Sequence, residues 1–136
     1  NKYVNPKECW DLNYTIAEFI LPRLRKFKED TVGYPGYGDV DTFEKWQNVL
    51  GKMELAFEYM ITNDNWWFKD PRYDYTEGLH MKCISSKDSV LGKITIEEED
   101  WVAKIRENHQ KEEYRRKQVM EEGLQLFAKY YKNLWW

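Results

Sequence analysis

The sequence predicts a mostly helical, all-α fold, and three stretches of periodic sequence support this prediction. Apolar residues recur at steps of three and four across residues 41–63, which places them on one face of an α-helix. Similar amphipathic patterns cover residues 11–28 and much of 95–135. A chain of 136 residues is long enough to bury one core. We therefore expect a single domain over residues 1–136.

Residues 41–63 are expected to form the central helix. Asp41 stands where an N-cap carboxylate would accept hydrogen bonds from the first amides, and Glu44 follows three residues later, as in a capping box. The apolar stripe is wide, so it must pack against other elements. Its members are Phe43, Trp46, Val49, Leu50, Met53, Phe57, Met60 and Ile61.

Residues 11–28 are expected to form the partner helix. Pro22 lies inside this run and removes one helical hydrogen bond, so a kink or a break is expected there. The Gly- and Pro-rich segment 30–40 suits a tight return, which predicts an antiparallel helical hairpin over residues 11–63. The stripe expected to face its partner is Leu12, Ile16, Phe19, Ile20, Leu24 and Phe27.

The run CWDLNYTIAEFILPRLRKFK, residues 9–28, resembles a pattern of small uncharacterised phage and prophage proteins. That pattern reads W-D-x-D, then F-x-L-P-R-L and F-K, and this chain departs from it at Asn13. The resemblance spans residues 9–60 and implies a phage or prophage origin, hence a host cytoplasm; it carries no activity and no functional residue. Its second half matches Trp46, Leu50, Lys52, Met53, Ala56, Phe57 and Glu58.

Residues 64–94 are expected to be an irregular connection, with a short hairpin as the alternative around Leu79, Met81 and Cys83. His80 and Cys83 have the spacing of two metal ligands, but a structural zinc site needs four. We therefore expect neither a metal nor another cofactor.

Aromatic and basic residues alternate near residues 65–75, which suits stacking on bases and binding of phosphates. The alternative is that these aromatics fold back as a lid over the helical hairpin. Under the first interpretation the ligand-binding residues are Trp66, Trp67, Arg72 and Tyr73, with Arg23, Arg25 and Lys82 as phosphate partners.

Residues 95–135 are expected to form a long C-terminal helix, continuous or broken. Thr95 and Glu98 have the spacing of a capping box, which predicts a helix start at Thr95. The segment 106–118 is polar on nearly every face, and Gly123 follows it, so a break is expected at one of these places if the helix does not protrude. A protruding arm with an apolar end predicts a homodimer.

Composition narrows the function. The net charge of −3 argues against general binding to duplex nucleic acid, and no apolar run is long enough for a membrane span. Two histidines and no nucleotide-binding fingerprint give no support to catalysis, so we expect a non-enzymatic, cytoplasmic protein.

Two functions fit these observations. The first is a phage-type accessory protein, acting in counter-defence, that sequesters a small anionic nucleotide-like signal in an aromatic and basic pocket. The second is a protein–protein inhibitor or assembly module that grips a host protein through its C-terminal helix. The excess of aromatic residues, 17% of the chain, suits either one.

Overall fold

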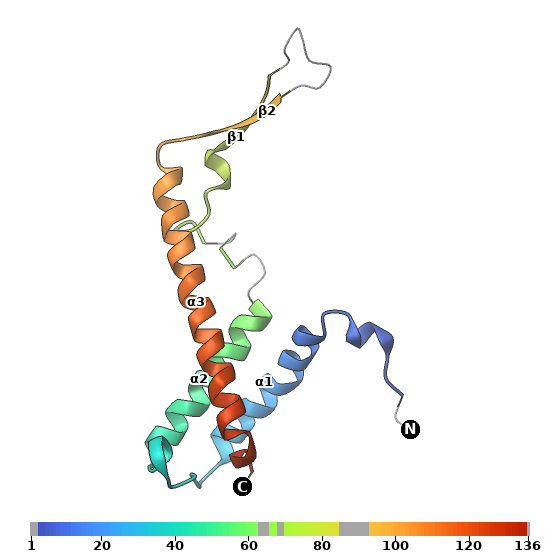
Figure 1. The fold of residues 1–136 in the computed structure, drawn as a ribbon, viewed down its shortest axis with the longest axis vertical. Helices are drawn as coiled ribbons and strands as arrows, with labels where there is room; N and C mark the ends of the chain where they lie inside the picture. The colour runs from blue at the N-terminus through green and yellow to red at the C-terminus, as the bar shows by residue number, and fades with distance from the viewer. Residues whose placement is uncertain (1–2, 63–65, 68–69, 85–92, 136) are drawn as a thin grey trace. The chain divides into compact units, whose positions relative to one another are not determined.

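A computed structural model describes residues 3–62, 66–67, 70–84 and 93–135 (Figure 1). The mostly helical prediction is confirmed. The chain forms two compact units, the first of residues 1–64 with 115–136 and the second of residues 65–114. The single domain stays a prediction. In chain order the elements are η1 (Pro6–Cys9), α1 (Leu12–Asp30), η2 (Gly38–Val40), α2 (Phe43–Thr62), η3 (Thr76–Gly78), β1 (Leu79–Ile84), β2 (Lys93–Glu98), α3 (Val102–Tyr130) and η4 (Tyr131–Asn133).

The antiparallel helical hairpin is confirmed, and its helices α1 and α2 lie side by side in the first unit (Figure 1). The end of α3 completes the core, because Tyr130 packs edge-on against Trp46 at 5.7 Å and Phe127 against Phe57 at 5.2 Å. Such pairs add to the stability that burial alone supplies. The buried residues of α2 are Trp46, Val49, Leu50, Met53, Ala56 and Phe57, so most of the predicted stripe is buried.

The face that α1 buries agrees only in part with the predicted one, since Leu24 is buried and Ile20 and Phe27 pack against the core. Its buried residues are Ala17, Leu21 and Leu24. Of the expected stripe, three members remain outside: Leu12, Ile16 and Phe19 are 51%, 46% and 59% exposed. The reason is that α1 is apolar around more of its circumference than α2 covers. Ala17, Leu21 and Leu24 follow at steps of four and three, and the small alanine allows a close helix–helix approach.

The start of α2 is shifted by one residue from the prediction. The cap is Thr42, whose Oγ1 accepts a hydrogen bond from the Lys45 amide at 3.2 Å. Asp41 instead binds the Lys45 ammonium at 2.9 Å, and this partner lowers the pKa of the Asp41 carboxyl. In the preceding loop, Gly36 and Gly38 adopt positive φ angles of 81° and 54°, as a tight return requires.

Pro22 lies inside α1 without ending the helix, so a break there is excluded. Proline supplies no N–H to the carbonyl of Glu18. The neighbouring Phe19 carbonyl accepts a hydrogen bond from a side chain, the Arg23 guanidinium, at 2.9 Å.

The predicted helix start at Thr95 is wrong, because Thr95 and Glu98 belong to β2 and α3 begins at Val102. β1 and β2 form an antiparallel hairpin in the second unit, with Leu79 opposite Glu98 and Met81 opposite Ile96. The alternation Ile-Thr-Ile has the period of a strand, and β-branched residues favour strands. This period therefore prevails over the capping pattern.

α3 is continuous over 29 residues, so neither the polar middle nor Gly123 breaks it. Gly123 has a packing role instead. A Cβ at this position would lie 2.2 Å from the Ala56 Cβ and 2.8 Å from the Lys52 carbonyl oxygen. The absence of a side chain thus allows the backbones of α2 and α3 to approach closely.

We expect Gly123→Ala to destabilise the protein by about 1–3 kcal/mol, because the added methyl would meet backbone atoms that must shift. The matched control is Gly51→Ala in α2, where a Cβ would have only an ordinary 3.6 Å contact with the Lys28 Nζ. Alanine favours helices, so the control should stabilise by up to about 1 kcal/mol. Urea denaturation measures the free energy of unfolding of both variants. Equal changes for the two substitutions would contradict the close packing at Gly123.

Candidate functional site

The structure distributes the residues predicted to bind a ligand over both units. It brings four of them together in the second unit, and the two arginines of α1 belong to the first. The side chain of Lys82, on β1, lies outside the described residues. The four are Trp66, Trp67, Arg72 and Tyr73, and the two are Arg23 and Arg25.

The aromatic residues of the second unit gather around His109 of α3, and we call Trp66, Trp67, Tyr73, Tyr75 and His109 the His109 cluster. Trp66 stacks on the imidazole with ring centroids 5.3 Å apart, and Trp67 meets it edge-on at 5.2 Å. Tyr75 also meets it edge-on, at 5.8 Å, and Tyr73 packs on Trp66 at 5.1 Å. The rings are thus used to pack on one another.

Two members of this cluster, Tyr75 and His109, are not among the residues predicted to bind a ligand. His109 contacts Trp66, Trp67 and Tyr75. Its side chain is buried, with 8% exposed, and its Nε2 has no hydrogen-bond partner among the described residues. A buried polar atom without a partner costs stability unless something binds it. A signal was present in the sequence, since His109 continues the apolar stripe of Val102 and Ile105 at helical spacing.

Each of the two arginines near the cluster already has a carboxylate partner. Arg72 forms a two-point contact with Asp70, with Nη2–Oδ2 at 2.9 Å and Nε–Oδ1 at 3.2 Å, which raises the pKa of Arg72. Arg106 pairs with Glu98 and lies over the Tyr75 ring at 5.3 Å. A phosphate group at this place would have to compete with these carboxylates.

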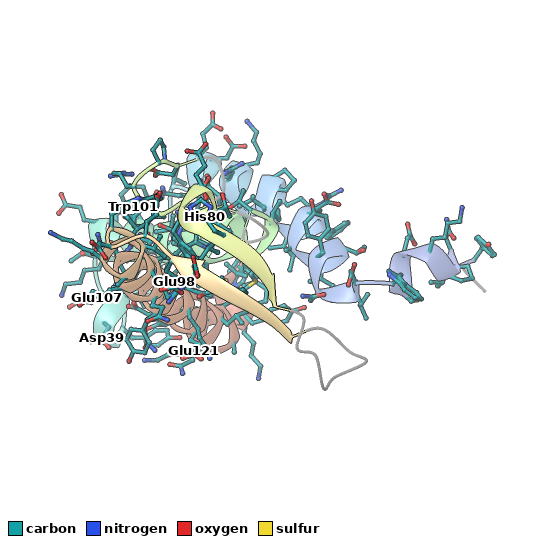
Figure 2. All side chains as sticks on the ribbon, turned by 90° about the horizontal axis from the view of Figure 1, so that it is seen from above. Asp39, His80, Glu98, Trp101, Glu107 and Glu121 are labelled. Carbon is teal, nitrogen blue, oxygen red and sulfur yellow. The ribbon has the colours of Figure 1, made fainter. Side chains whose placement is uncertain are left out.

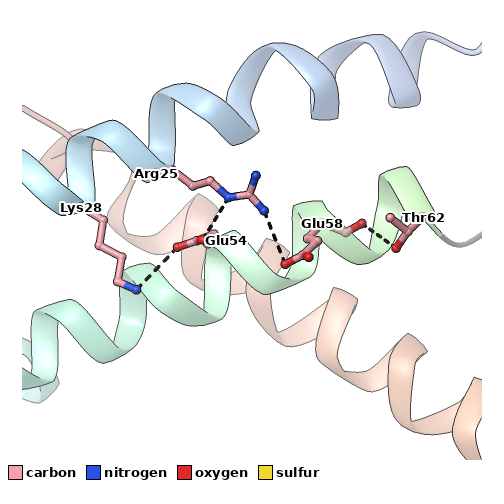
Figure 3. Close-up of polar contacts among 5 residues, drawn as sticks. All are labelled: Arg25, Lys28, Glu54, Glu58 and Thr62. Carbon is pink, nitrogen blue, oxygen red and sulfur yellow. Dashed lines mark hydrogen bonds and ion pairs between the residues drawn. The ribbon is translucent and has the colours of Figure 1, made fainter.

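Arg25 participates in ion pairs that join α1 to α2 (Figure 3). Its Nε lies 3.1 Å from Glu54 Oε1, and its Nη2 lies 3.5 Å from Glu58 Oε2. Lys28 reaches Glu54 Oε2 at 3.5 Å. These are partly exposed pairs of modest energy, and they account for Arg25 as a contact within the hairpin.

The exposed side of α1 forms one wall of a groove in the first unit, which we call the α1 groove. Its volume is about 660 Å³, and the end of the chain forms its second wall. A volume of this size is in the range of ligand and peptide sites. The lining is mainly apolar and consists of Glu8, Thr15, Ile16, Phe19, Ile20, Arg23, Leu24, Phe27, Phe127, Tyr131 and Leu134.

Two opposite charges line the α1 groove, one on α1 and one in the short helix η1 before it. Arg23 lies two helical turns beyond Ile16, and its guanidinium sits over the Phe19 ring at 3.8 Å. Glu8 precedes α1, in η1, and is exposed. In the part of the chain that the structure describes, neither charge has an oppositely charged partner.

A further set of polar contacts, which includes His80 and Trp101, lies where the β-hairpin meets the start of α3 in the second unit (Figure 2). Glu99 accepts a hydrogen bond from Trp101 Nε1 at 2.6 Å and lies 3.5 Å from His80 Nε2. Gly78 packs under Val102 and Trp101, where a Cβ would come within 2.2 Å of the valine. Across the described residues, no three His, Cys, Asp or Glu side chains gather as a metal site would need.

Comparisons with known proteins give no family for this chain: no family model, no curated protein and no solved structure matches it. The phage resemblance therefore stays a prediction, and the functional argument depends on geometry. None of the described helices has the length and apolar character needed to cross a bilayer.

Substitution of His109 tests whether its ring or its nitrogen matters more for stability. We expect His109→Ala to cost about 2–4 kcal/mol, because it removes a ring that several aromatic rings contact. His109→Phe keeps a ring and removes the unpartnered nitrogen, so its stability should equal or exceed that of the parent. Urea denaturation followed by tryptophan fluorescence measures both. Equal losses for the two variants would show that the nitrogen is bonded and needed.

Proposed function

We propose that this protein is a non-enzymatic interaction module that binds an amphipathic helical segment of a protein in the α1 groove. The observation that carries the proposal is the exposed apolar stripe of Leu12, Ile16 and Phe19 beside a groove of about 660 Å³. Exposed apolar surface rimmed by polar residues marks interaction sites in soluble proteins.

The chemistry of the lining supports binding rather than catalysis. Among the described residues that line the α1 groove, none is a histidine, cysteine or lysine, and Glu8 is the one carboxylate. A single carboxylate without a positioned nucleophile or a second acid–base group beside it gives little support to catalysis. Apolar side chains form most of the wall and favour burial of apolar anchors. Glu8 and Arg23 add charges that would orient a bound segment.

The dimensions favour a helix as the bound segment. Between Thr15 and Phe27 the groove follows α1 for about 18 Å, which is about three turns of a helix. A helix of that length presents apolar anchors at steps of three and four, as in other helix-in-groove complexes. The second wall of the groove supports a part for the end of the chain in this binding, because Phe127 of α3 and Tyr131 of η4 line it.

A display library of helix-forming 16-residue peptides tests this proposal at nanomolar protein concentration. We expect enrichment of peptides with apolar anchors at helical spacing, and an affinity at least 30-fold weaker for Phe19→Asp, because central anchors dominate such interfaces. The matched control is Phe43→Asp, which changes a phenylalanine that is also exposed, at 41%, and lies outside the groove. Peptides that bind Phe19→Asp as tightly as the parent would refute the site.

The His109 cluster supports a second candidate, the sequestration of a small anionic nucleotide-like signal. The observation in its favour is the buried Nε2 of His109, which would gain a partner from a phosphate or ring atom of a ligand. Aromatic faces and two nearby guanidinium groups suit a purine and its phosphates. A counter-defence role for such binding rests on the phage resemblance.

A thermal-shift screen with nucleotides, cyclic dinucleotides and cyclic ADP-ribose isomers tests this second candidate. A ligand at 100 times its dissociation constant stabilises the fold by about 2.7 kcal/mol, which raises the melting temperature by several degrees. The shift should disappear in Trp66→Ala/Arg72→Ala and persist in Phe19→Asp. A panel without shifts, or a shift unaffected by the double substitution, would exclude the cluster as the site.

A further inference from the structure

We infer that the helix bound in the α1 groove is α1 of a second copy of this chain, with the two helices antiparallel about a two-fold axis beside Ile16. This inference rests on the proposed function, because it names the occupant of the same groove. In a two-fold interface the same patch serves both partners, so the patch must be complementary to itself.

The apolar part of the patch meets this requirement. Leu12, Ile16 and Phe19 are exposed at steps of four and three, with Ile16 between the other two. In an antiparallel pairing centred there, Leu12 of one copy faces Phe19 of the other, and the two Ile16 side chains meet at the axis. Each copy then covers the exposed stripe of the other copy. Burial of this apolar surface drives association.

The charges meet the requirement as well. Glu8 precedes the stripe and Arg23 follows it, so reversing one copy brings each Glu8 to the Arg23 of the other. Both are exposed and lack an oppositely charged partner among the described residues. Arg23 presents five N–H donors, and the Phe19 carbonyl accepts from one nitrogen, Nη1. A parallel pairing would instead bring like charges together, which disfavours it.

The chain offers a test that isolates this register. Sedimentation equilibrium of the full chain, up to about 200 µM, should give a mass twice the 16.7 kDa of one copy. We expect Phe19→Asp to weaken dimerisation at least 30-fold, and Phe43→Asp to leave it unchanged. Circular dichroism should show that both exposed sites tolerate substitution without loss of helix.

Charge reversal gives the sharper measurement. Glu8→Lys and Arg23→Glu should each weaken self-association about tenfold or more, since each places like charges across the interface. An equimolar mixture of the two variants should form a heterodimer of near-parental affinity, because both cross-interface pairs are then opposite in charge. The double variant Glu8→Lys/Arg23→Glu should also recover the dimer.

The outcomes separate this inference from the function on which it rests. A parent chain that stays monomeric and still binds the selected peptides overturns the second copy and leaves the peptide groove intact. A monomer that binds no peptide refutes both. A dimer that is indifferent to Phe19→Asp uses another surface, and a mixture that fails to recover overturns the antiparallel register.

Discussion

The exposed apolar surface beside the α1 groove depends on how α1 packs against its neighbours. A helix buries only the part of its circumference that its neighbours cover, and α1 is apolar on more than that part. The residues that α1 contributes to the buried core are Ala17, Leu21 and Leu24. Successive residues of a helix are rotated by about 100°. Ile16, one position before Ala17, and Phe19, two positions before Leu21, are therefore turned away from that core. The exposed stripe is therefore a direct consequence of the packed one, and it provides the apolar wall of the α1 groove.

The second wall depends on a different constraint, the closeness of α3 to α2. Gly123 lies against Ala56 with no room for a side chain, so the two backbones approach as closely as their atoms permit. This contact lies one to two turns before Phe127 and Tyr130 along α3. It therefore supports the edge-on aromatic pairs that anchor the end of the helix, and Phe127 and Tyr131 then line the groove.

The hydrophobic periodicity of the sequence predicted the buried face of a helix correctly where only one face is apolar. The α2 stripe was predicted well because its apolar residues occupy one face and leave no alternative. The α1 stripe was predicted only in part, because two neighbouring faces are apolar and only the fit against the core decides between them. Residues 93–98 show the same competition on a smaller scale, where a strand period prevailed over a capping pattern. The role of His109 depends on Trp66 and Trp67, which lie more than forty residues earlier, and no local pattern reports such contacts.

Electrostatics distinguishes the two candidate surfaces. Around the His109 cluster the cations already have carboxylate partners, Arg72 in Asp70 and Arg106 in Glu98. A bound anion would have to replace these carboxylates, so its net gain in binding free energy would be small. The α1 groove differs, because Glu8 and Arg23 stand beside an apolar stripe without such partners in the described chain. Exposed charges of this kind cost little in the free protein, since water solvates them, and they gain a partner only when a surface of complementary sign arrives. The balance of pairing thus favours the α1 groove over the His109 cluster as the proposed binding site.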